Sequence, residues 1–120
     1  MSNWSRDMLG VKKLSEVSGS ASISSGTLTL NLATATTFYV SLNAAITTLT
    51  ITNVPTGTAA FTLIFTADGT ARSVTWGASV LWPGNTAPTL TSTNGKRDIF
   101  SFVTLNGGTN WYGFTGGQNF

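Results

Sequence analysis

Two acidic side chains in the later part of the sequence, Asp68 and Asp98, are the residues most suited to catalysis. Glycoside hydrolysis needs two carboxyl groups that face each other at about 5–10 Å, and no other pair lies beyond residue 16. Asp68 lies in an Asp-Gly turn, and Asp98 opens a predicted strand after two basic residues. A turn residue and a solvated charge are therefore the simpler interpretations.

The absence of two residue types excludes most other catalytic machinery. The sequence contains no histidine and no cysteine. Without histidine there is no Ser-His-Asp triad and no imidazole base, and the commonest metal ligand is missing. Without cysteine there is no thiolate metal site, disulfide or redox centre. We expect a protein that is not an enzyme and holds no metal or cofactor.

Aromatic side chains are the second group with a chemical use. Trp76 and Trp82 precede a Pro-Gly turn, and Trp111 and Tyr112 are neighbours in a predicted strand. Such rings pack in a core or between subunits, or they stack on the face of a sugar. Because neighbouring residues of a regular strand point to opposite faces, Trp111 and Tyr112 cannot both be buried. Packing in a core or between subunits is favoured, and a glycan platform is the alternative.

Signals for phosphate or nucleic-acid binding are weak. The pairs Gly107-Gly108 and Gly116-Gly117 lack the spacing of a phosphate-binding loop. Lys96 and Arg97 lie near aromatic residues, as in proteins that hold single strands, but an acidic residue follows them at once. We expect no nucleic-acid partner.

Alternating apolar and polar residues dominate the sequence after position 22. Leu28, Leu30 and Leu32 alternate with Thr and Asn, which is the period of a half-buried strand. Further strands are predicted at 37–43, 46–52, 59–66, 71–76, 98–105 and 110–114, with turn residues between them. The sequence predicts an all-β domain over residues 23–120, an antiparallel jelly-roll-like sandwich or a small barrel.

The charged residues are unevenly placed. Residues 17–67 contain no Asp, Glu, Lys or Arg, whereas a solitary soluble domain usually scatters charges over its surface. The segments 59–66 and 98–105 are apolar on both faces, which indicates central strands or strands that face a neighbouring subunit. Both observations favour a homo-oligomer.

The first 22 residues differ in kind from the rest. Trp4, Met8, Val11 and Leu14 fall near helical spacing, although Gly10 weakens a helix. Residues 18–20 read as a flexible link. One interpretation is a frayed tail, and the favoured one is an arm that orders against a partner with these four side chains as anchors. No signal peptide or membrane-spanning run is recognised, so we expect neither export by the usual route nor membrane insertion.

Residues 27–115 resemble a small Thr-rich β module of tail-fibre and other virion proteins of tailed bacteriophages, including those of cyanobacteria and marine bacteria. The landmarks are TLTLNLATATTFYVSLNAAITTLTITN, TGTAAFTLIFTADGTARSVTW, WPGNTAPTLTSTNGKRDIFSFVT and GGTNWYGF. The resemblance implies a trimeric, non-enzymatic β domain on a phage particle, assembled in the host cytoplasm. It supplies no catalytic residue.

Since the chain has no long repetitive shaft, the expected role is a short tail fibre or knob. Its N-terminal arm would attach to another virion protein of the tail, baseplate or capsid. Its β domain would contact the host surface, with polysaccharide as a possible ligand. The alternatives are a capsid decoration (cement) protein and a glycan-binding adhesin module.

Overall fold

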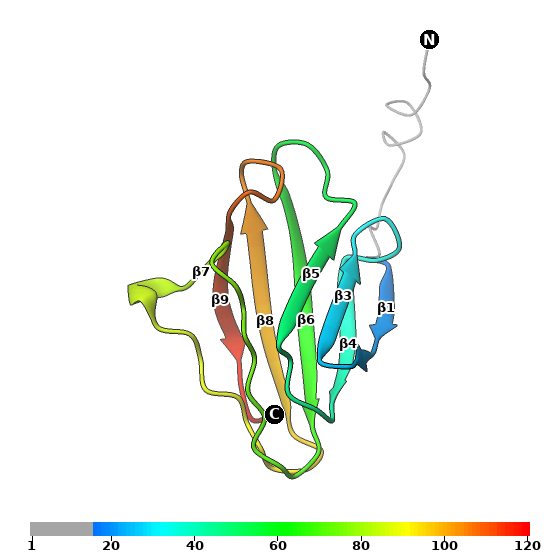
Figure 1. The fold of residues 1–120 in the computed structure, drawn as a ribbon, viewed down its shortest axis with the longest axis vertical. Helices are drawn as coiled ribbons and strands as arrows, with labels where there is room; N and C mark the ends of the chain where they lie inside the picture. The colour runs from blue at the N-terminus through cyan, green and yellow to red at the C-terminus, as the bar shows by residue number, and fades with distance from the viewer. Residues whose placement is uncertain (1–15) are drawn as a thin grey trace, which may run out of the picture.

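Two β-sheets face each other in this structure, a computed structural model that describes residues 16–120 (Figure 1). The larger sheet has the strand order β1-β4-β6-β8-β9-β7, and the smaller has the order β2-β3-β5. The strands are β1 (Ser18–Ala21), β2 (Ile23–Ser24), β3 (Thr27–Asn31), β4 (Thr37–Leu42), β5 (Thr48–Thr52), β6 (Ala59–Ala67), β7 (Val80–Leu81), β8 (Arg97–Thr104) and β9 (Trp111–Gly117). The predicted all-β sandwich is confirmed. Within the described residues, no helix is long and apolar enough to cross a membrane.

The sheets are mixed, which corrects the antiparallel pairing expected from the sequence. Strands β3, β4, β5 and β6 alternate between the two sheets. This part of the chain therefore winds twice around the core between them. As a result β3 pairs with β5 in parallel, and β4 pairs with β6 in parallel. Three pairs are antiparallel: β2 with β3 and β8 with β9, which short turns join, and β6 with β8, which the segment 68–96 joins.

The core lies between the sheets and follows the predicted alternation. Phe61, Leu63 and Phe65 of β6 point inward, as do Phe100 and Phe102 of β8. The rings of Phe61 and Phe102 stack with centroids 4.8 Å apart. β6 and β8 are the two middle strands of the larger sheet, which agrees with one of the two interpretations of 59–66 and 98–105, that of central strands.

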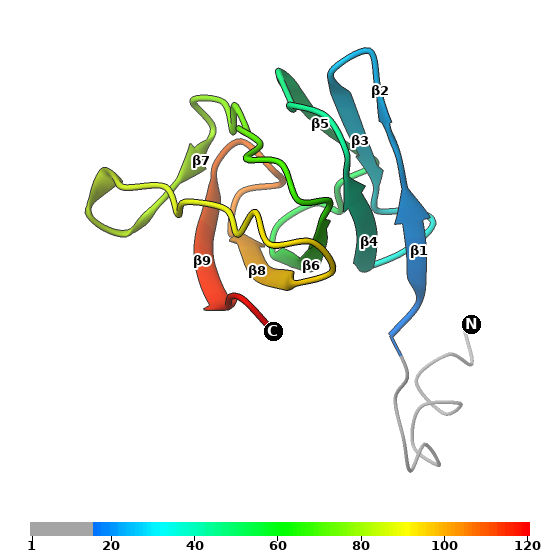
Figure 2. The same cartoon turned by 90° about the horizontal axis from the view of Figure 1, so that it is seen from below.

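Residues 68–96 are largely irregular apart from β7 and a 3-10 helix at Pro83–Asn85, and they take the place of a second sheet over β8 and β9 (Figure 2). The strand predicted at 71–76 is absent, and Val74 makes only an isolated bridge with Ile46. Trp76 and Trp82 of this segment pack on Phe100 and Phe102, with ring centroids 5.6–6.0 Å apart. Two indole rings bury enough apolar surface to cover the sheet without a strand.

The predicted link at residues 18–20 is a strand. β1 pairs with β4 in parallel, and the backbone N–H of Thr36 donates to the carbonyl of Val17 at 2.9 Å. Ser and Gly are typical of linkers, but the edge of β4 offers unpaired backbone groups that this segment satisfies. The β domain therefore begins at about residue 17 and not at residue 23.

Candidate functional site

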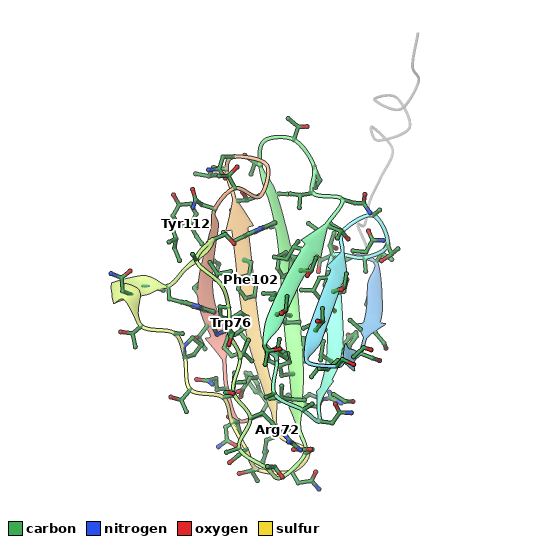
Figure 3. The ribbon with its side chains drawn as sticks, in the orientation of Figure 1. Arg72, Trp76, Phe102 and Tyr112 are labelled. Atoms are coloured by element: carbon green, nitrogen blue, oxygen red, sulfur yellow. The ribbon has the colours of Figure 1, made fainter. Side chains whose placement is uncertain are left out.

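The predicted aromatic residues divide between the core and the surface. Trp76, Trp82 and Trp111 are buried within the sandwich, and the rings of Trp76 and Trp82 meet with centroids 5.0 Å apart. These three residues are core packing, which agrees with one of the favoured interpretations and corrects the expectation that they form a glycan or intersubunit surface. Trp76, Phe102 and Tyr112 are labelled in Figure 3; the first two are buried, whereas Tyr112 is 49% exposed. The predicted anchors Trp4, Met8, Val11 and Leu14 lie outside the described residues.

The outward face of the larger sheet carries an exposed apolar cluster. Its members come from neighbouring strands, because Tyr112 of β9 pairs with Val103 of β8 and with Leu81 of β7. We call Leu81, Ile99, Val103, Tyr112 and Phe114 the outer apolar patch. Leu81, Tyr112 and Phe114 remain 38–49% exposed, and the patch contains no charged residue. The alternation of β9 places Tyr112 and Phe114 on this face because Trp111 occupies the other.

A groove lies on the same face toward the edge formed by β1 and β4. Its volume is about 210 Å³, and its lining includes the polar, aromatic and charged side chains of Ser20, Tyr39, Ser41, Asn43, Thr66 and Arg97. We call it the Tyr39 groove. The strand register places Ser41, Thr66 and Arg97 in one row across β4, β6 and β8, and it places Ser20 beside Tyr39. The tyrosine is 46% exposed.

The charges around the Tyr39 groove are positive on balance. Within residues 16–120 the one salt bridge joins Arg72 Nη2 to Asp68 Oδ2 at 2.7 Å. The hydrogen bond from Arg72 holds the pKa of Asp68 below its ordinary value. Glu16 accepts a hydrogen bond from Thr37 Oγ1 at 3.0 Å, at the far end of β4 from Ser41. No carboxylate therefore lines the groove, and Arg97 is its charged residue.

Asp98 is buried, which corrects its interpretation as a solvated charge. Only 2% of the residue is exposed, and its carboxylate accepts hydrogen bonds from Thr91 N at 2.7 Å, Asn119 N at 3.0 Å and Gln118 Nε2 at 3.1 Å. Burial raises the pKa of Asp98, but these hydrogen bonds outweigh it and hold the pKa below its ordinary value. The side chain joins β8, the segment 68–96 and the C-terminal residues.

Asp68 has the turn role expected from the sequence. Its Oδ1 accepts a hydrogen bond from the backbone N–H of Thr70 at 3.1 Å, as an aspartate in an Asp-Gly turn commonly does. The other carboxylate oxygen is held by Arg72, which lies at the end of the molecule where β6 ends (Figure 3). Both carboxylates thus have structural partners, and they do not form the open, facing pair that glycoside hydrolysis uses.

Sequence reasoning missed two surface residues that matter here, Tyr39 and Phe114. The signal was present, because Tyr39 alternates with Phe38 and Val40, which the structure buries. A large aromatic residue at one of the alternate strand positions that point away from the core indicates an exposed ring. Comparisons of the chain with models of protein families, with curated proteins and with solved structures find no match. No relative therefore supplies a site or an activity.

Proposed function

We propose that this protein is a structural component of a bacteriophage particle, without enzymatic activity, and that it acts as a short tail fibre or knob. The observation that carries the proposal is the outer apolar patch. Exposed Tyr112, Phe114 and Leu81 adjoin one another without a charged residue among them, where a solitary domain would place polar side chains. The assignment to a phage comes from the resemblance of residues 27–115.

The proposed assembly is a homotrimer whose three outer apolar patches meet. Leu81, Tyr112 and Phe114 are 38–49% exposed, so their association with the same residues of other copies would remove apolar surface from water. Aromatic residues are also enriched at the centres of such interfaces.

Attachment to the particle is assigned to the N-terminal residues. Trp4, Met8, Val11 and Leu14 would insert into another virion protein of the tail or baseplate. If that partner belongs to the capsid, the same arrangement describes a decoration protein. In either case the protein assembles in the host cytoplasm and ends in the virion.

The native mass of the full chain, measured by light scattering, tests the proposed assembly. We expect a trimer that becomes a monomer when Tyr112→Lys and Phe114→Lys are combined, because two charges would be buried in the interface. Val17→Lys is the matched control, since Val17 is exposed but lies outside the patch. A wild-type monomer, or a double variant that remains a trimer with an unchanged circular dichroism spectrum, would contradict the proposal.

A second role, contact with host polysaccharide, is favoured by the Tyr39 groove. An exposed tyrosine ring with hydroxyl and amide groups beside it matches the apolar face and the polar edge of a sugar. A glycan array probed with the full chain tests this role. Failure to bind any glycan would leave the structural role alone.

A further inference from the structure

We propose that the Tyr39 groove binds one pyranose unit that carries a carboxylate, within an acidic polysaccharide. The inference rests on the proposed contact with polysaccharide, and it does not depend on self-association. The groove volume of about 210 Å³ is below the roughly 300–1,000 Å³ of pockets for drug-sized ligands, which suits a single sugar unit.

The ring of Tyr39 supplies the apolar contact. Its partner across the pair with β1 is Ser20, and its partner on β6 is Ile64. Directly opposed side chains lie about 4.5–5.5 Å apart, so a serine at that distance is too small to cover the tyrosine. One side of the ring is thus open to a ligand, in agreement with its 46% exposure.

Arg97 selects for a negative charge. Its guanidinium group can donate two parallel hydrogen bonds to a carboxylate, a geometry that lysine cannot reproduce. No carboxylate of the groove competes for it, because Asp68 is held by Arg72 and Asp98 points into the core. An anionic sugar in the groove therefore meets a cation, and no described side-chain carboxylate lines the groove.

The polar side chains beside these two residues match the hydroxyl groups of a sugar. Ser41 and Thr66 lie in the row that ends at Arg97, and Asn43 follows the end of β4. Hydroxyl and amide groups both donate and accept hydrogen bonds, as ring hydroxyls do. Neighbouring strands are about 4.8 Å apart, so the backbone positions of Ser41 and Arg97, two strands apart, are separated by roughly 10 Å. The two residues can therefore contact different edges of one ring.

Two-dimensional ¹⁵N–¹H spectra of the full chain test the proposal by titration with trigalacturonic acid, with neutral galactotriose as the control. We expect saturable shifts at residues of the groove with the acidic sugar and much weaker binding of the neutral one. Sodium chloride should weaken the binding, because the ion pair is exposed. Arg97→Gln should weaken binding of the acidic sugar at least about tenfold, as expected for a charge-assisted hydrogen bond.

The variants at Tyr39 separate stacking from folding. Tyr39→Phe keeps the ring and should retain binding, and Tyr39→Ala should lose most of it. Leu105→Ala is the control, because this side chain is 63% exposed and lies outside both the groove and the outer apolar patch. Each variant is used only if its spectrum keeps the wild-type dispersion.

Three results would overturn the inference. Equal shifts with sodium acetate alone would reduce the groove to a general anion site. Binding that is unchanged in Arg97→Gln would exclude the selection of a carboxylate. Sugar-induced shifts confined to other surfaces would exclude the groove while leaving the contact with polysaccharide in place. If neither the titration nor the glycan array detects a bound sugar, the acidic-sugar site and the contact with polysaccharide are both excluded. The proposed trimer, which light scattering tests, is not affected by that result.

Discussion

The backbone N–H of Asn119 donates a hydrogen bond of 3.0 Å to the carboxylate of Asp98, which joins the C-terminal residues to the start of a central strand. The same carboxylate also holds the segment 68–96 through Thr91 N. Three parts of the chain that are distant in sequence thus meet at one buried charge. No other described side chain is placed to replace it, since the chain has few carboxylates.

Replacement of Asp98 should therefore destabilise the fold. In Asp98→Asn an amide group would face backbone donors, and buried N–H groups would lose their acceptor. We expect a loss of about 2–4 kcal/mol in the free energy of unfolding. In a domain of this size that lowers the melting temperature by about 10 °C or more. Thermal unfolding followed by circular dichroism measures it, with Asp68→Asn, at an exposed turn, as the control that should change little.

Acid should weaken the same contact. Because the pKa of Asp98 is lower in the folded state than the ordinary value of 3.8, the unfolded state binds more protons near that pH. The contribution of Asp98 is therefore complete above about pH 5 and is lost as the pH falls through the folded pKa. Urea unfolding at pH 6 and pH 3 should show the gap between wild type and Asp98→Asn narrowing in acid. A constant gap would contradict this linkage.

Gly113 leaves room for an indole ring. A Cβ atom at this position would lie 3.0 Å from Cη2 and Cζ3 of Trp82 and 3.1 Å from Cε1 of Phe102. Since both rings are buried, Gly113→Ala should cost about 1–3 kcal/mol in the free energy of unfolding. Gly19→Ala is the matched control in β1, where the nearest atom is Ala35 Cβ at 3.4 Å. Equal stability of the two variants in urea would contradict this reading of the core.

The N-terminal boundary can be tested by truncation. Removal of residues 1–15 should leave the melting temperature within a few degrees of wild type, because β1 and Val17 remain. Removal of residues 1–21 takes away β1 and exposes the edge of β4, which should lower stability and promote association through that edge. Melting temperature and light scattering measure both effects. If the two truncated proteins have the same melting temperature and native mass, residues 18–21 would be a flexible link and not a stabilising strand.

Local alternation predicted the positions of most strands. The inward residues of β3, β4, β6 and β8 follow the period of two, and the opposite environments of Trp111 and Tyr112 follow from the same rule. The segment 71–76 has a similar alternation without forming a strand. Its tryptophan packs against β8 instead, a contact between residues far apart in the sequence.

The sequence by itself determined that residues 23–120 form an all-β domain, because the burial of a strand face is visible in successive residues, but it left a sandwich and a small barrel open. Only the tertiary structure decided which strands are parallel, since parallel and antiparallel pairs satisfy the same backbone groups and the path of the connections selects between them. It also decided that Asp98 is buried and that Tyr39 and Arg97 lie on one groove. These relationships depend on strand register across β4, β6 and β8, which no local pattern contains.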